Sequence, residues 1–552
     1  MRHLLAPAAA LLLGAADPPA RYDLLIRDAV IYDGSGGAPY RGELGVRGDR
    51  IICVRTCPAG QAASVVDARG RALAPGFINM LSHSRESLLH DGRAMSAVLQ
   101  GVTLEVNSEL SHAPMTPAMR RARESRQGAI KTPLEWSTLG GYFDRVERGG
   151  VSVNVASHVG AGAVREFVLG ANDVDPGPEQ LARMRELVRD AMRDGALGLA
   201  TMLLYIPERY AETPELVALA SEAGRCGGLF AAHVRNEGDA LLEALDEVVA
   251  IGREARVPVH VHHLKQSLPR NWPKLDAAVA RIEAARASGV RVTADMYLYA
   301  ASRTGADAML PAWVQEGGLE ATIARLRDPA TRARAKAGMR DRDPEHVLLS
   351  GFRTDALRPY TGKRLAEVMR MRGDADWRDT VIDLIVADGS RVSTVFFTMS
   401  EDNVRRQTAL PWMTFGSDSS AIAAEGLLLG DGAHPRTYGN FARLLGGYVR
   451  DQRTMPLAEA VRKLTALPAD TLSLRDRGRL RAGGHADLVL FDPAAIRDNA
   501  TFADPHRYAT GVTHVWVNGV AVVRDGAHTG ARPGRALRGP GWTGHPGGGA
   551  CR

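Results

Sequence analysis

GGLFAAHVRNEGD at residues 227–239, the helical run ALLEALDEVVAIGREA at 240–255 and VPVHVHHLK at 257–265 form the stretch that decides the fold. Two short apolar segments, each ending in histidine, flank one amphipathic helix. This pattern is typical of a βαβ unit, in which a crossover helix joins two parallel strands. It therefore predicts a parallel sheet with a histidine at the carboxyl end of two neighbouring strands.

The two strand-end histidines are candidate metal ligands. Side chains alternate between the faces of a strand, which places His233 and His263 in phase with small or apolar residues of their strands. In a parallel barrel that face is the lumen, and the chemistry lies at the carboxyl ends of the strands. His260 and His262 have the opposite phase from His263, so we expect them to face the outer helices or the rim and assign neither to a metal.

Residues 76–473 continue the alternation of apolar strands and amphipathic helices. VSVNVASHVG, EQLARMRELVRDAMRDGA, LGLATML and TPELVALASEAGRCG follow one another in this order. The alternation and the number of repeats favour an α/β fold, a TIM-like (β/α)8 barrel rather than an open sheet. The rhythm breaks at about 305–362 in a charged segment, which we interpret as an insertion that covers the barrel mouth.

Both ends of the chain have the texture of short β-strands. Residues 22–75 and 474–538 alternate apolar and polar positions between Gly-rich turns. We expect these two segments to assemble into one small β-sandwich beside the barrel. The Gly-rich residues 539–552 are predicted to form a flexible tail.

The composition is that of an ordinary globular chain, with 552 residues, 45% hydrophobic content and a net charge of +6. The Arg residues are scattered among acids without a basic stripe interleaved with aromatics, which argues against nucleic-acid binding. Residues 1–20 combine a short basic end, an apolar core and small residues, which predicts a signal peptide and export to the periplasm or the medium. The chain has no later run of about 18 apolar residues, so we do not expect stable membrane insertion.

The four cysteines do not predict a disulfide framework in so long a chain. Cys53 and Cys57 lack the second half of a zinc ribbon, and either a bridge or two free thiols fits the pair. Cys226 precedes Gly-Gly at a strand start and is interpreted as structural.

A series of segments resembles the amidohydrolase superfamily, specifically the N-acyl-D-amino-acid deacylases, or D-aminoacylases. The resemblance runs from Tyr22 to Arg538 through LAPGFINMLSHS (73–84), QGVTLEV (100–106), AAHVRNEGD (231–239), VPVHVHHLK (257–265), MYLYAASRTG (296–305), FGSDSS (415–420) and RGRLRAGGHADLVLFDP (477–493). It implies a barrel with a β-sandwich and metal-dependent hydrolysis of the C–N bond of a linear amide. It also implies an N-acyl-D-amino acid as the small-molecule substrate.

Zinc is the expected metal, because neutral imidazoles on adjacent strands suit this ion. Bound zinc lowers the pKa of its water towards about 7, which makes hydroxide available to attack an amide. Asp418, in FGSDSS, stands where the family keeps its catalytic aspartate. The resemblance implies that Asp418 takes a proton from this water and passes it to the leaving amine.

Two positions depart from the family pattern. The first strand ends Leu81-Ser82-His83 where most members have His-x-His, so Leu81 removes a ligand and His83 is only a further candidate. After the second strand, Leu110 stands in the register of the usual metal-binding Cys, and Glu109 can supply an anionic ligand instead. We predict one zinc ion held by His233, His263 and Glu109. A binuclear centre is not expected, since no Lys is a clear candidate for a carboxylated bridge.

Candidate substrate-binding residues supply cations and hydroxyl groups near the strand ends. They are Lys265, Tyr297, Ser302, Arg303 and Arg436, and a guanidinium suits the free α-carboxylate of an N-acyl amino acid. Two alternatives stay open. One is hydrolysis of a cyclic amide or an isoaspartyl-type dipeptide. The other is a degenerate member of the family that binds a ligand without turning it over.

Overall fold

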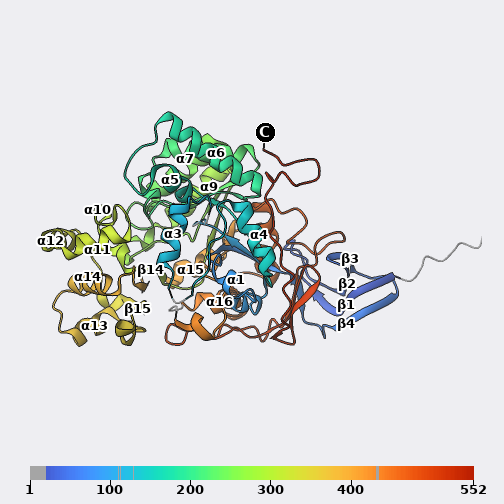
Figure 1. Cartoon of the computed structure of the whole chain (residues 1–552). Coiled ribbons are helices and arrows are strands. Elements are labelled where there is room, and N and C mark those ends of the chain that lie inside the picture. Colours follow the sequence, from blue (N-terminus) through green and yellow to red (C-terminus); the bar gives the residue numbers. More distant parts are fainter. Residues whose placement is uncertain (1–19, 110, 112, 129, 431–433, 552) are drawn as a thin grey trace, which may run out of the picture.

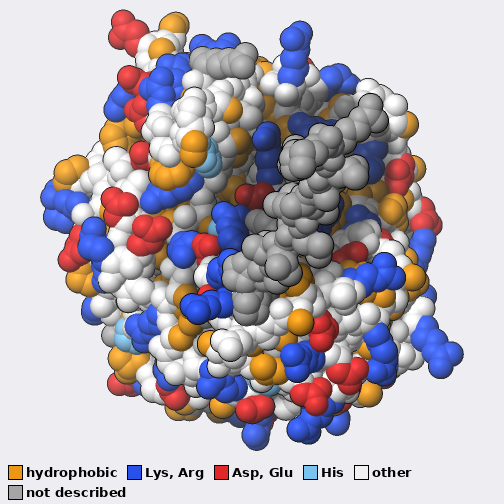
Figure 2. Space-filling view, turned by 90° about the vertical axis from the view of Figure 1, so that its right-hand side faces the viewer, with side chains coloured by type: hydrophobic (Ala, Val, Ile, Leu, Met, Phe, Trp, Pro, Cys, Tyr) orange, Lys and Arg blue, Asp and Glu red, His pale blue; other side chains and the backbone are white. Residues whose placement is uncertain are grey.

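The computed structural model describes residues 20–109, 111, 113–128, 130–430 and 434–551. The predicted signal peptide, residues 1–20, lies outside the described residues except for residue 20, and Leu110 lies outside them. No helix in the described ranges is long and apolar enough to cross a membrane. Figure 2 shows one face of the molecule, on which Lys and Arg side chains lie among Asp and Glu side chains.

The centre of the molecule is the predicted (β/α)8 barrel. In the described part of the chain its parallel strands are β6 (Phe77–Ser82), β7 (Val102–Asn107), β8 (Asn154–Ser157) continued by β9 (Val159–Gly160), β10 (Gly198–Met202), β11 (Leu229–His233), β12 (Val259–Val261), β13 (Val292–Met296) and β18 (Met413–Phe415). The ring closes between the first and last strands. The Asp418 N–H donates to the Leu81 carbonyl at 2.9 Å, and the His83 N–H donates to the Ser419 carbonyl at 3.1 Å.

Strand alternation separates two apolar layers. Inward residues such as Leu104, Ala200 and Ala231 pack with one another in the barrel lumen. Outward residues such as Phe230 and Val259 pack against the surrounding helices. These helices include α6 (Pro178–Asp194), α7 (Thr213–Arg225), α8 (Leu241–Ala255) and α9 (Leu275–Ala287), and Figure 1 shows α6, α7 and α9 grouped at the top of the view. The expected βαβ unit is therefore β11–α8–β12.

The two chain ends form one β-domain, as predicted. Its strands are β1 (Ala20–Ile31), β2 (Tyr40–Arg47), β3 (Arg50–Arg55), β4 (Gly60–Asp67), β5 (Ala72–Pro75), β19 (Leu488–Phe491), β20 (Val512–Val517), β21 (Val520–Arg524) and β22 (Ala527–His528). Antiparallel pairing of β5 with β19 joins the two ends in a single hydrogen-bonded sheet. Ile26, Leu44, Leu488 and Trp516 share its buried core. Figure 1 shows β1–β4 projecting to the right of the barrel.

The insertion is longer than the sequence indicated. It builds a separate sheet, ordered β14 (Ser302–Gly305), β17 (Ser393–Phe396), β15 (Val347–Gly351) and β16 (Lys363–Arg364). Helices α11 (Leu319–Arg327), α12 (Pro329–Ala337), α13 (Leu365–Arg372) and α14 (Trp377–Asp388) surround this sheet at the left of Figure 1. The predicted end at residue 362 is therefore too early. After residue 362 the helices α13 and α14 and the strand β17 follow the helix–strand alternation seen in the barrel sequence, but they pack in the insertion's own core.

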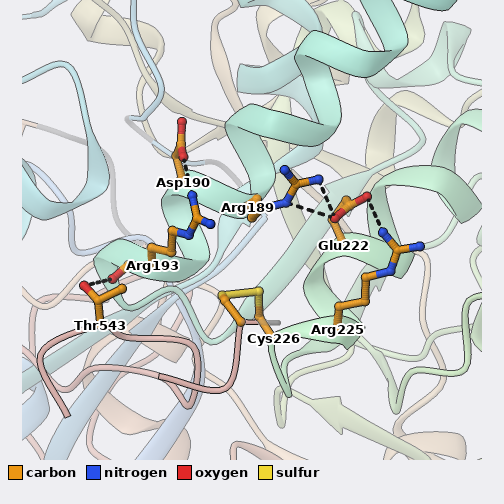
Figure 3. Close-up of a disulfide and its surroundings, with 8 residues drawn as sticks. Arg189, Asp190, Arg193, Glu222, Arg225, Cys226 and Thr543 are labelled. Carbon is orange, nitrogen blue, oxygen red and sulfur yellow. Dashed lines mark hydrogen bonds and ion pairs between the residues drawn. A yellow bond between two sulfur atoms is a disulfide. The ribbon is translucent and has the colours of Figure 1, made fainter. Parts of the chain in front are cut away.

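All four cysteines lie in disulfides. Cys53 bonds to Cys57, and Cys226 bonds to Cys551 across a separation of 325 residues. The tail predicted to be flexible instead lies against the barrel: the Gly539 N–H donates to the Gly195 carbonyl at 2.8 Å. Figure 3 shows the Cys226 disulfide beside α6 and α7. The Gly-rich composition of residues 539–552 predicted a flexible segment, but the disulfide between Cys551 and Cys226 restrains it.

Candidate active site

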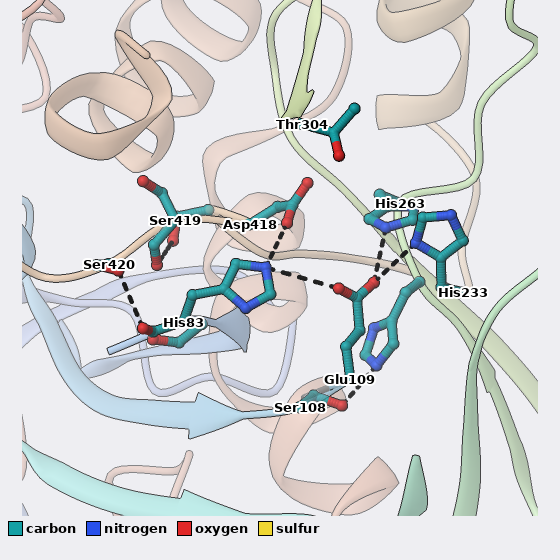
Figure 4. Close-up of polar contacts among 12 residues, drawn as sticks. His83, Ser108, Glu109, His233, His263, Thr304, Asp418, Ser419 and Ser420 are labelled. Atoms are coloured by element: carbon teal, nitrogen blue, oxygen red, sulfur yellow. Dashed lines mark hydrogen bonds and ion pairs between the residues drawn. The ribbon is translucent and has the colours of Figure 1, made fainter. Parts of the chain in front are cut away.

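The predicted ligands meet at the carboxyl end of the barrel. His83 follows β6, Glu109 follows β7, His233 ends β11, His263 follows β12 and Asp418 follows β18. Figure 4 shows these side chains converging from their separate strands. The carboxyl ends of parallel strands meet at one edge of the barrel, and this common edge explains why residues far apart in the chain form one site.

Glu109, His233 and His263 form a buried group with the chemistry of a metal site. Glu109 Oε1 lies 2.8 Å from His263 Nε2 and 3.2 Å from His233 Nδ1. One possible ligand atom from each residue lies within 4.8 Å of the others. Burial opposes the charge on Glu109, but His263 and His233 hold the pKa of this carboxyl well below its usual value. Two nitrogens and one anionic oxygen fit zinc.

The backbone turns sharply at three of these residues. Glu109, His263 and Asp418 have φ values of 59°, 32° and 46°, in the left-handed region that residues with a Cβ seldom adopt. Such conformations persist at functional sites only where the surrounding structure enforces them. Here they aim the side chains across the barrel mouth.

The predicted orientation of His260 and His262 is wrong. His260 is in register with Ala231 of β11 and Thr293 of β13, both on the lumen side. His260 and His262 therefore point into the barrel and not towards the outer helices or the rim, while Val259 packs outward. His263 reaches the site because its positive φ redirects the chain after β12. The prediction overlooked this turn because it extended regular alternation past the strand.

His83 joins the site through Asp418. His83 Nε2 lies 2.8 Å from Asp418 Oδ1 and 3.6 Å from Glu109 Oε2. His83, Glu109 and Asp418 thus form a second possible ligand group, which shares Glu109 with the first. A glutamate side chain therefore links the two groups. Leu81, the residue in place of a histidine, is fully buried in the first strand.

Asp418 is an ionised carboxylate held in a fixed orientation. Arg436 Nη1 lies 3.0 Å from Asp418 Oδ2, and both residues are buried. Burial opposes the charge on Asp418, but Arg436 and the hydrogen bond from His83 lower its pKa to about 2. Asp418 can therefore accept a proton throughout the neutral pH range.

Lys265 is paired with a residue that the sequence interpretation missed. Lys265 Nζ lies 2.5 Å from Glu237 Oε1 and 2.9 Å from His263 Nδ1. Burial opposes the charge on Lys265, but Glu237 outweighs it and raises the pKa of the lysine. Glu237 also lies 3.1 Å from His263 Nδ1. Its place four residues after His233, in the loop that follows β11, was the available signal.

Two adjoining cavities, of about 580 and 700 Å3, open over the ligand groups. Both are lined by His83, Asp418 and Arg303. Of the predicted substrate-binding residues, Lys265, Ser302, Arg303 and Arg436 line one cavity or both. Tyr297 lines neither: it is fully buried, with the Arg436 guanidinium 4.5 Å from its ring centre. Tyr297 therefore supports a cation and does not face the substrate space.

Many of the side chains that line the first cavity are arginines. From the barrel and the insertion they include Arg209, Arg270, Arg303, Arg340, Arg342 and Arg391. Arg270 is paired with Asp239, and Arg391 is paired with Asp307. The insertion thus adds cationic side chains to the mouth of the barrel, a feature that follows from tertiary structure alone.

Comparisons with known proteins agree with this geometry. The family model described as "Amidohydrolase family" matches residues 64–523. N-acyl-D-glutamate deacylase of Alcaligenes xylosoxydans xylosoxydans is 33% identical over 523 residues, which covers 94% of this chain and 97% of the relative.

Solved structures show the same similarity. N-acyl-D-glutamate deacylase from Bordetella bronchiseptica, complexed with zinc and a phosphonate that mimics the tetrahedral intermediate, has a TM-score of 0.78 at 30% identity. A D-aminoacylase structure that addresses the role of a binuclear metal centre also has a TM-score of 0.78 at 30% identity. In both comparisons 94% of this chain and 100% of the other chain are covered.

Proposed function

Because the chain belongs to the amidohydrolase family, we propose that it is a zinc-dependent deacylase of N-acyl-D-amino acids. The observation that carries the proposal is the placement of Glu109 Oε1 between His263 Nε2 and His233 Nδ1, at 2.8 and 3.2 Å, beside an ionised Asp418. His233, His263 and Glu109 would hold the catalytic ion. Zinc at this position supplies Lewis-acid activation of the amide carbonyl and of water.

The protein's own groups handle the proton. Asp418 takes a proton from the attacking water, and the same proton then passes to the nitrogen of the leaving amino acid. The products are the carboxylic acid from the acyl group and the free amine. Arg436 keeps Asp418 ionised before the attack, and His83 orients its other oxygen.

The cationic lining favours a linear substrate with a free carboxylate. An N-acyl amino acid carries this group, and a guanidinium can bind it through two parallel hydrogen bonds. Arg303 and Arg436 line the cavity that contains Asp418. A cyclic amide without a carboxylate makes no use of these cations, so the lining supports the deacylase over that alternative. The ordered set of ligands and proton carrier likewise supports an enzyme over a ligand-binding relative.

A substrate panel with reversible metal removal tests the proposal. N-acetyl-D- and N-acetyl-L-amino acids are assayed beside hydantoins and isoaspartyl dipeptides, before chelation, after it and after zinc is restored. We expect hydrolysis of N-acetyl-D-amino acids that is lost on chelation, regained with zinc and absent in His263→Ala. No hydrolysis of any N-acetyl-D-amino acid by the zinc-loaded protein would refute the substrate assignment.

We also propose that the protein is exported to an oxidising compartment, the periplasm or the medium. The pairing of Cys53 with Cys57 and of Cys226 with Cys551 supports this, since structural disulfides persist mainly in such compartments. Fractionation of the native host, with N-terminal sequencing of the mature chain, tests the proposal. A cytosolic protein that retains residues 1–20 would contradict it.

A further inference from the structure

A second cluster of histidines lies in the barrel lumen, below the active site. His260 on β12, His262 immediately after β12 and Asp295 on β13 are all fully buried, with exposed fractions of 1%, 1% and 0%. The proposed hydrolysis uses none of them. Burying a carboxylate together with two imidazoles is costly unless each polar atom has a partner, and here the three side chains partner one another and neighbouring groups.

The three side chains converge on one point. His262 Nδ1 and His260 Nε2 lie 2.7 and 2.9 Å from the same oxygen, Asp295 Oδ2. The two imidazole rings are 5.2 Å apart at 79° to each other. The other oxygen, Asp295 Oδ1, accepts the backbone N–H of His263 at 2.8 Å, which orients the carboxylate. One possible ligand atom from each of the three residues lies within 4.8 Å of the others.

The outer nitrogen of each ring is held by a hydroxyl group. His260 Nδ1 lies 2.8 Å from Thr293 Oγ1, and His262 Nε2 lies 2.6 Å from Ser108 Oγ. Metal-binding histidines typically have this arrangement, in which a hydrogen bond to the far nitrogen sets the tautomer and leaves the near nitrogen for the ion.

His158 adds an imidazole that has no hydrogen bond. It lies between β8 and β9 with 2% of its surface exposed, and among the described residues neither ring nitrogen has a hydrogen-bond partner. Burial, together with the nearby His262 and His260, lowers the pKa of His158 to about 3, so the ring is neutral. A buried polar side chain without a partner is rare and indicates an unseen ligand such as an ion or a water.

We propose that His260, His262 and Asp295 form a second zinc site in the barrel lumen, with His158 as the candidate fourth ligand. Three imidazole nitrogens and one carboxylate oxygen would fill all four positions of the ion, and a zinc site closed off from solvent without an open position is structural rather than catalytic. The site shares no ligand with the catalytic group. Its ion stabilises the barrel and fixes the neighbours of two catalytic ligands, since His262 precedes His263 and Ser108 precedes Glu109.

Anomalous diffraction on crystals of the unmodified protein grown with zinc tests the site directly. Data above and below the zinc edge should give one peak among Glu109, His233 and His263, and another among His260, His262 and Asp295. The first peak is the internal control for zinc loading. If the catalytic peak is present and the lumen holds none, the cluster is a hydrogen-bonded network only and the proposal is overturned.

Metal analysis of His260→Gln provides a second test. Because one nitrogen ligand is lost, bound zinc should fall by about one equivalent per chain while the catalytic ion stays. His346→Gln, at an exposed histidine of the insertion, is the matched control and should keep the full zinc content. An unchanged zinc content in His260→Gln would contradict the proposal. If that variant does not fold, the diffraction test on the unmodified protein still decides.

Discussion

Replacement of Arg436 by Met should convert Asp418 from an ionised carboxylate into one that is protonated in weak acid. Arg436 and Asp418 are 3% and 9% exposed, so solvent screens their interaction little. At an effective dielectric constant of about 20, unit charges 3.0 Å apart interact by about 5 kcal/mol, or about four pKa units. Burial opposes ionisation further once the guanidinium is removed.

The sign of the change follows from the starting value. In the unmodified protein the pKa of Asp418 is lowered to about 2, so its carboxylate is ionised at every pH at which the protein is assayed. Loss of Arg436 raises this pKa to about 5–6 on the same Coulomb reasoning. The base is then lost as the pH falls through that range, whereas the activity above it is reduced only by weaker substrate binding.

The assay is kcat/KM for an N-acetyl-D-amino acid as a function of pH, with bound zinc measured at each pH. Arg436→Met should show an acidic limb displaced upward by about three to four pH units relative to that of the unmodified protein. Arg436→Lys, which keeps a positive charge, should show a smaller displacement. A uniform loss of activity at all pH values, with the acidic limb unmoved and zinc retained, would refute the assigned roles of Arg436 and Asp418.

Three further changes test other parts of the structure. Glu109→Ala removes the anionic ligand and should weaken zinc binding at the catalytic site by at least about 100-fold, as measured by competition with a chelator; undiminished affinity would remove Glu109 from the ligand set. Burial raises the pKa of Glu208 to about 8. Between pH of about 4.3 and 8 the folded protein therefore keeps a proton on Glu208 that the unfolded chain has lost, so the free energy of unfolding declines as the pH rises through this range. Glu208→Gln should therefore remove a slope of up to about 1.4 kcal/mol per pH unit, and denaturant midpoints at pH 6 and pH 9 that shift equally would contradict this. Cys551→Ser opens a loop of 325 residues and should cost up to about 6 kcal/mol in the chain-entropy model, which unfolding under non-reducing conditions measures; an unchanged midpoint would show that the Cys226 bond adds nothing.

Local sequence patterns predicted the elements that carry the site. The βαβ pattern around His233, the alternation that builds the barrel and the acidic residues at strand ends all survive in the structure, because strand periodicity and helix amphipathicity are short-range properties. Glu109 and Asp418, which both follow apolar strands, were assigned from the family resemblance. Parallel strands bring such positions to one edge whatever the intervening sequence.

Tertiary structure alone decided how those elements combine. Register with β11 and β13 turned His260 and His262 into the lumen, and a left-handed φ brought His263 to the site, neither of which strand alternation encodes. The end of the insertion depends on which core its helices join. The bond from Cys226 to Cys551 depends on a tail folding back over 325 residues. The elements therefore followed from the sequence by itself and the candidate ligands from the sequence with its family resemblance, while long-range packing decided orientation, pairing and the buried histidine cluster.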